Sequence, residues 1–116
     1  MSSETRHTPG PIINEGETPR GVMLLAGPED RKTIIYLYGP ERQQYARLIA
    51  AAPELLTELQ AAHQIIRNAL AVMSTKQKLE WGRRNARDGV EGEGVTRANE
   101  REAVIARATG QEASND

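Results

Sequence analysis

Apolar residues at alternating spacings of four and three run through the middle of the chain, from residue 48 to residue 73. The row consists of Leu48, Ala52, Leu55, Leu59, Ala62, Ile66, Ala69 and Met73. A second row, Ile49, Leu56, His63 and Leu70, repeats every seven residues beside it. Such spacing is typical of a helix with a broad apolar face, sustained over more than three heptads. Any fold of this chain therefore has to accommodate a long amphipathic helix.

Pro53 interrupts this pattern near its start. Proline removes a backbone N–H and clashes with the preceding turn, so a helix tolerates it best in its first turn. We therefore predict a short helix over residues 41–51, a kink or break, and a long helix over residues 53–73.

Two further helices are predicted in the C-terminal half. The segment from Ser74 to Gln77 has the form of a capping box, which predicts a helix over residues 74–87, although this segment could equally continue the preceding helix. Three glycines over residues 89–94 mark a flexible loop. Thr96 is then predicted to cap a last helix over residues 96–109, Gly110 to end it, and residues 110–116 to be a disordered tail.

The N-terminal part predicts a β-hairpin. A short apolar run at residues 21–27 and the β-branched and aromatic run at residues 33–38 flank a turn, so we predict the hairpin over residues 21–38. Both faces of the second strand are fairly apolar, so the hairpin is either covered on both sides or paired with another strand. Residues 1–20 contain three prolines and predict an extended arm or a loop that docks on something.

Together these elements predict an α+β fold that is mostly α. An extended N-terminal arm and hairpin precede a long helix packed in an antiparallel helical hairpin or bundle, with residues 21–109 as a single domain. The chain has one Trp, three Tyr and no Phe, so its core holds little aromatic volume. A short chain with so thin a core often buries further surface against copies of itself, and we predict a homo-oligomer.

Composition excludes several classes of protein. With no Cys, the chain has neither disulfides nor thiolate chemistry, as suits a reducing cytoplasm. No signal peptide and no stretch of about 18 apolar residues is recognisable, so we predict a soluble cytoplasmic protein without a membrane partner. The net charge of −1 argues against a protein dedicated to nucleic acid.

No motif predicts catalysis or a cofactor. His7 and His63 lack partners at metal-ligand spacing, and no nucleophile elbow, P-loop or dinucleotide fingerprint is present. The G-V-E-G-E-G stretch at residues 89–94 carries glutamates where a phosphate would sit, so it is better read as a linker. We predict that the protein is not an enzyme and binds no metal or cofactor.

The strongest binding candidate is a basic segment around Trp81. Between residues 74 and 87 five basic residues, Lys76, Lys78, Arg83, Arg84 and Arg87, stand against one acidic residue, Glu80. Basic side chains beside an aromatic ring suit contacts with the phosphates and bases of nucleotides. The alternative is a solvated helix end, because positive charge near a helix C-terminus is favourable in itself.

A second candidate group lies near the hairpin. Tyr36, Tyr38 and Tyr45, with Arg42 and Arg47 nearby, could line a ligand pocket, although residues of this size could also form core.

Two segments resemble a group of short phage and prophage proteins. Arg6-His7-Thr8-Pro9-Gly10-Pro11 is similar to their H-T-P-G-P-W start, with Ile12 in place of Trp. Residues 45–56, Y-A-R-L-I-A-A-A-P-E-L-L, are similar to their N-A-R-L-I-A-A-A-P-E-L-L segment at the start of a long helix, with Tyr45 in place of Asn. The resemblance covers about half of the chain, and it directs attention to His7 and Arg47.

The resemblance implies a phage-encoded accessory protein, and small accessory proteins of phages often act against host defence. Two mechanisms suit a helical oligomer without catalytic residues. One is a sponge that binds and sequesters a small signalling nucleotide, which is the hypothesis we prefer. The other is a stoichiometric inhibitor that covers a surface of a host defence protein or nucleoprotein complex.

Overall fold

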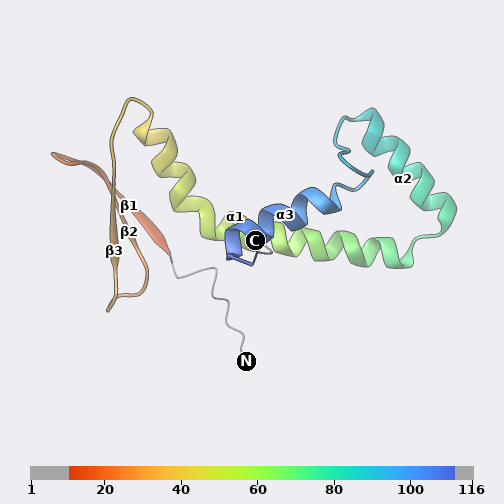
Figure 1. Cartoon of the computed structure of the whole chain (residues 1–116), viewed down its shortest axis with the longest axis horizontal. Helices are drawn as coiled ribbons and strands as arrows, with labels where there is room; N and C mark the ends of the chain where they lie inside the picture. Colours follow the sequence, from red (N-terminus) through yellow and green to blue (C-terminus); the bar gives the residue numbers. More distant parts are fainter. Residues whose placement is uncertain (1–10, 112–116) are drawn as a thin grey trace, which may run out of the picture. The chain divides into compact units, whose positions relative to one another are not determined.

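The computed structural model describes residues 11–111 (Figure 1). A three-stranded antiparallel sheet comes first, with strands β1 (Ile12–Thr18), β2 (Gly21–Ala26) and β3 (Thr33–Leu37) in that order. Three helices follow, α1 (Arg42–Val72), α2 (Thr75–Arg87) and α3 (Ala98–Thr109). The predicted fold class, α+β and mostly α, is confirmed.

Strand β2 lies in the middle of the sheet and supplies its core. Val22 and Leu24 alternate along the strand toward the same face, and both are completely buried. Ala46 of α1 is buried with them, and Ile35 and Leu37 of β3 pack against this cluster. The predicted hairpin is therefore present as β2 and β3, with its core under α1.

Strand β1 corrects the prediction for residues 1–20. Residues 12–18 are a strand that pairs with β2 from Ile12↔Ala26 to Thr18↔Gly21, so the extended segment docks on the hairpin as its third strand. The sequence signal was weak because most residues of β1 are exposed on an edge strand and do not alternate in polarity. Two of the three prolines that suggested an arm, Pro11 and Pro19, lie just outside the strand, and the third lies outside the described residues. Residues 1–10 lie outside the described residues.

A polar clamp joins the start of α1 to the sheet. The Glu17 carboxylate of β1 accepts a hydrogen bond from Arg42 Nε at 2.9 Å and another from Gln43 Nε2 at 2.5 Å. Arg42 Nη1 also donates to the Gly39 carbonyl at 2.7 Å. Two residues of the first helical turn are thus fixed to one strand residue, which sets the direction in which α1 leaves the sheet.

Helix α1 continues through Pro53, so of the predicted kink or break at this residue the break is wrong. Proline costs the helix one hydrogen bond from the backbone, but the residues around it, Ala50, Ala51, Ala52 and Leu55, are strong helix formers. Leu56, just beyond the proline, is buried and gives the helix a packing contact at that point. Packing and propensity together outweigh one missing donor.

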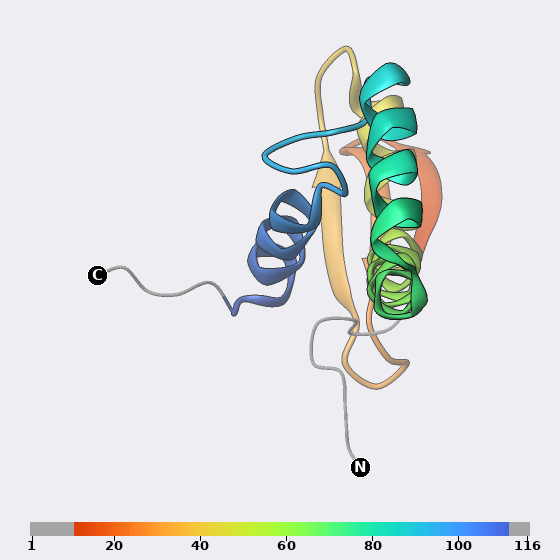
Figure 2. The same ribbon diagram turned by 90° about the vertical axis from the view of Figure 1, so that its right-hand side faces the viewer.

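The boundary between α1 and α2 follows the capping box. Ser74 Oγ accepts from Gln77 N at 3.1 Å, and Gln77 Oε1 accepts from Ser74 N at 2.8 Å, so the predicted capping box is confirmed. The question of whether the helix continues is thereby settled in favour of a separate α2. From its last turn the chain passes through a loop into α3 (Figure 2).

Helix α3 starts later than predicted. Its N-cap is Arg97, which has left-handed backbone and makes no capping hydrogen bond through its side chain, so Thr96 is not the cap. Gly110 ends the helix in the left-handed conformation, as predicted. Residues 112–116 of the predicted tail lie outside the described residues.

The contacts of the chain divide it into two compact units, residues 1–56 and residues 57–116. The first holds the sheet and the beginning of α1, and the second holds the rest of α1 with α2 and α3. That residues 21–109 fold as a single domain stays a prediction. No helix among residues 11–111 is long and apolar enough to span a membrane.

Candidate functional site

The predicted binding residues fall into both units. Tyr36, Tyr45 and Arg47 belong to the unit of residues 1–56, whereas Lys76, Trp81, Arg83 and Arg84 lie on α2. His7 lies outside the described residues. In the first unit the side chains do not converge: Tyr36 is half-buried with the Arg20 guanidinium 5.9 Å from its ring centre, while Tyr45 and Arg47 are exposed on α1. Their role in binding stays a prediction.

Trp81 lies in a pocket within the second unit. The apolar part of its wall comes from Ile66, Trp81, Val90 and Val95, and the polar part from Asn85, Thr96, Arg97 and Arg101. The cavity has a volume of ≈ 220 Å³. The basic residues beside the tryptophan ring are therefore arginines from the loop and α3. Arg83 and Arg84 of α2 instead extend to Glu80, at 3.5 Å and 3.2 Å.

Arg101 is held rigidly at this pocket. Its Nε donates to His63 Nδ1 at 3.0 Å, and its Nη1 donates to the Thr96 carbonyl. A guanidinium can only donate, so His63 Nδ1 is the acceptor in the first of these bonds, and His63 Nε2 lies 3.5 Å from Glu102 Oε2. The remaining nitrogen, Nη2, is buried and has no hydrogen-bond partner within residues 11–111. A buried charged donor without an acceptor is costly, so it marks a place where a ligand atom would be stabilised.

The loop before α3 brings Arg97 to the same pocket. Arg97 is the one non-glycine residue with positive φ in the described part of the chain, at 56°. Its Nη1 donates to the Glu91 carbonyl at 3.1 Å, and Asn85 Nδ2 donates to the Val95 carbonyl at 2.5 Å. The segment predicted to be a linker is thus tied to α2 and to itself, and it closes one side of the pocket.

Glu100 balances part of this positive charge. Its Oε2 accepts a hydrogen bond from Glu93 N at 2.7 Å, and this bond is the main reason that the pKa of Glu100 lies below the usual range of a glutamate. Its own backbone N–H lowers the pKa further, desolvation raises it, and the charges of Arg97 and Arg101 add smaller lowering effects. The charges of Arg97 and Arg101 are thus partly balanced by this carboxylate, whose second oxygen, Oε1, is buried without a hydrogen-bond partner within residues 11–111.

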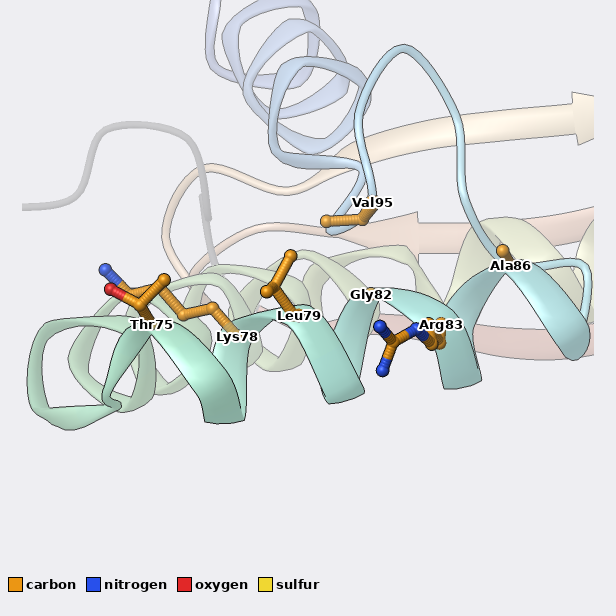
Figure 3. A pocket seen from close by; sticks show the side chains of 7 residues that line it. All are labelled: Thr75, Lys78, Leu79, Gly82, Arg83, Ala86 and Val95. Carbon is orange, nitrogen blue, oxygen red and sulfur yellow. The ribbon is translucent and has the colours of Figure 1, made fainter.

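A second concave surface lies on another side of α2 (Figure 3). It is a groove of ≈ 490 Å³ with an apolar floor made by Leu79, Gly82, Ala86 and Val95. Lys78 and Arg83 stand at its edges. The predicted basic cluster is therefore divided: Arg83 borders this groove, and Trp81 lines the pocket.

The comparisons with known proteins concern the chain as a whole. A family model described as Salmonella phage P22 protein Y8K6 matches residues 1–112. The chain belongs to this family. It is thus a phage protein, and the predicted phage-encoded accessory protein is confirmed at that level. No curated protein matches the chain, and no solved structure does.

The sequence analysis singled out Trp81, whose role in binding stays a prediction, but it did not single out Arg97 and Arg101, which line the same pocket. In the sequence, a glycine-containing loop separates both arginines from Trp81. Only the folding of that loop brings them to the pocket that Trp81 lines. One signal was available: His63 lies on the apolar face of α1, and an imidazole there, with a side chain only 12% exposed, needs a polar partner, which is Arg101.

Proposed function

We propose that this phage accessory protein binds and sequesters a small anionic ligand with a planar ring in the Trp81 pocket, without transforming it. A signalling nucleotide is the ligand class that best matches these properties. The observation that carries the proposal is that Trp81, Arg97 and Arg101 line one pocket, and that Arg101 keeps a buried nitrogen, Nη2, without a hydrogen-bond partner within residues 11–111. A phosphate or base oxygen would supply the missing acceptor.

The chemistry of the wall suits both parts of a nucleotide. The indole of Trp81 offers a flat apolar surface for stacking, which contributes about 1–3 kcal/mol per base in nucleic-acid-binding proteins. Arg97 and Arg101 supply guanidinium groups, whose planar donors match the oxygens of a phosphate. The ionised Glu100 balances part of their charge.

The size of the pocket limits what it encloses. Pockets for drug-sized ligands measure about 300–1,000 Å³, and the Trp81 pocket has ≈ 220 Å³. It can therefore enclose one ring or one phosphate, and the rest of a nucleotide would extend beyond it. A homo-oligomer, as proposed from the thin core, could cover that exposed part with a second copy.

Binding without reaction is supported by the residues that line the pocket. Its ionisable groups are the two arginines, which stay protonated at physiological pH and cannot act as general bases. A protein that binds a signal without consuming it acts by stoichiometry. Such action fits an anti-defence role in the host cytoplasm, where a phage protein can accumulate to high concentration.

The single tryptophan provides a direct test. We would follow its fluorescence while titrating a panel of mononucleotides and cyclic dinucleotides at constant ionic strength. A ligand that stacks on Trp81 should quench the emission saturably. Arg97→Gln should weaken binding about tenfold or more, because a hydrogen bond to a charged group contributes about 1.5–3 kcal/mol. Arg84→Gln removes the same charge from a 63% exposed side chain at Glu80, so it is the matched control.

Native mass spectrometry of the protein purified from bacterial cells complements this titration. A bound mass in the nucleotide range that is released on denaturation would support the proposal and identify the ligand class. If no mass is released, no member of the panel quenches the fluorescence, and Arg97→Gln behaves like Arg84→Gln, the proposal is wrong.

The alternative function, stoichiometric inhibition of a host defence protein or nucleoprotein complex, is supported by a different surface. The groove on α2 is apolar and open, as a protein interface requires, and it lacks the convergent donors of a nucleotide site. Activity against host defence that survives Arg97→Gln but is lost when Lys78 and Arg83 are reversed in charge would favour this alternative.

A further inference from the structure

We propose that the groove on α2 binds an amphipathic helix with acidic flanks, supplied by a partner protein. Thr75, Leu79, Gly82 and Ala86 follow one another at spacings of four, three and four, so they form a single stripe along the helix. Val95, from the loop before α3, closes the groove on one side (Figure 3). An apolar helix face that lies against another helix has this periodicity.

The floor of the groove is apolar and accessible. Leu79 is 58% exposed and Val95 is 47% exposed, although both are large hydrophobic residues. Single exposed apolar residues are common on protein surfaces, but these two line the same groove with Gly82 and Ala86. Contact with a partner would remove this continuous strip from water.

The shape of the floor suits a helix in particular. Ala86 is exposed and has only a methyl group, so a partner backbone can come close to α2 there, whereas Gly82 is buried beneath Val95. Val95 Cγ1 lies 3.3 Å from the position that a Gly82 Cβ would occupy, so the Val95 side chain packs against Gly82 and limits the depth of the groove there. From Thr75 to Ala86 the stripe spans about 16 Å at 1.5 Å per residue, which is the length of three helical turns.

The charges around the groove determine which helix it would accept. Lys78 stands at one edge and Arg83 at the other, and Arg83 is 74% exposed on its side chain. Helix α2 carries five basic residues and one acidic residue, Glu80, which already interacts with Arg83 and Arg84. Acidic residues on both flanks of the partner helix would therefore meet unbalanced positive charge, which accelerates association and selects the partner.

This surface is less suited to nucleic acid. Phosphates could contact Lys78 and Arg83, but they would leave the apolar floor in water. An acidic amphipathic helix satisfies the floor and the edges together, so the observations favour a protein ligand.

The test uses the full chain and synthetic labelled peptides of about 15 residues, or about four helical turns. The first peptide is an amphipathic helix with Leu and Ala on one face and Glu on both flanks. The second has the same apolar face with Lys flanks, and the third is the first in scrambled order. Fluorescence anisotropy should show binding of the Glu-flanked peptide alone.

Charge reversal makes the test specific. In the double variant Lys78→Glu/Arg83→Glu, the affinity for the Glu-flanked peptide should fall about tenfold or more, and the Lys-flanked peptide should now bind. Leu79→Ser should also lower the affinity for the Glu-flanked peptide, but it should not create binding of the Lys-flanked peptide. Arg87→Gln, which changes a charge outside the groove lining, should bind like the wild type. Circular dichroism and thermal unfolding verify that each variant is folded.

Three results would overturn the proposal. The first is that the scrambled peptide binds as tightly as the Glu-flanked peptide. The second is that a random-sequence DNA duplex displaces the Glu-flanked peptide, and does so equally well from the wild type and from Leu79→Ser. The third is a change in the native mass of the free protein on reversing Lys78 and Arg83, which would assign the groove to a second copy of this chain.

Discussion

Arg97 combines an unfavourable backbone with a position in the Trp81 pocket. A non-glycine residue with left-handed backbone costs about 1–2 kcal/mol, and its φ of 56° places it in that region. Strained residues often occur at functional sites, because the surrounding structure has to hold them there.

This strain predicts a difference between two substitutions at the same residue. Arg97→Gly and Arg97→Gln both remove the guanidinium, but only glycine adopts a φ of 56° without a steric penalty. Arg97→Gly should therefore be more stable than Arg97→Gln by about 1 kcal/mol, as measured by urea unfolding. Both variants should lose ligand binding alike. Equal stability of the two would show that the conformation is not strained.

Glu100 predicts how stability depends on pH. Its hydrogen bond from Glu93 N, together with its own backbone N–H and the nearby arginines, lowers its pKa in the folded protein relative to the unfolded value of about 4.3. Such a group stabilises the fold fully above the unfolded pKa and loses this contribution as the pH falls through the lower, folded pKa. Stability of the wild type should therefore fall more steeply below about pH 4.3 than that of Glu100→Gln.

Unfolding by urea at a series of pH values measures this difference. Glu58→Gln is the control, because Glu58 is exposed on α1 and forms no ion pair within residues 11–111. If the curves of the Glu100→Gln variant and the wild type run parallel through the acid range, the hydrogen bond from Glu93 does not stabilise the charged carboxylate.

Single residues also mark the limit of prediction from sequence. Trp81 was identifiable because it is the one tryptophan and lies among basic residues. Arg97 and Arg101 were not, since no periodicity links them to α2 and their approach depends on side-chain bonds such as Asn85 Nδ2 to the Val95 carbonyl. A contact made by a loop leaves little trace in local sequence.

At the scale of elements, the helices with strong local signals were predicted well. The Ser74 capping box placed the start of α2, and Gly110 placed the end of α3, because both signals act within one helical turn. Strand β1 was missed because its pairing with β2 is a tertiary interaction and its own residues are mostly polar. Pro53 misled the prediction because a local rule was overridden by the residues around it.

Pro53 gives a prediction for α1 as an element. Alanine at this position restores a backbone N–H that can bond to the Ile49 carbonyl, and alanine favours a helix interior over proline by about 3 kcal/mol. Part of this gain is offset by the loss of the half-buried ring. Pro53→Ala should raise stability by about 1–2 kcal/mol in thermal and urea unfolding. A neutral or destabilising effect would mean that α1 requires the proline at this point, for example to set a bend.

At the scale of the whole molecule, the proposed binding surfaces both belong to residues 57–116, and the sheet unit has its own buried cluster of Val22, Leu24 and Ala46. The two surfaces share one residue, since Val95 lines the Trp81 pocket and the groove on α2. The loop that carries Val95 therefore borders both the proposed nucleotide site and the proposed helix-binding groove.

Because Val95 lines both sites, binding at one site can be thermodynamically linked to binding at the other. If a nucleotide shifts Val95, it changes the affinity of the groove for the acidic helix by some factor, and the helix must change the affinity for the nucleotide by the same factor. Anisotropy titrations of the peptide with and without saturating nucleotide, and the reverse titrations, should give one common value. Val95→Ala should move that value toward one, whereas Arg84→Gln should leave it unchanged. In such a phage protein, the presence of one host molecule would change the affinity for another.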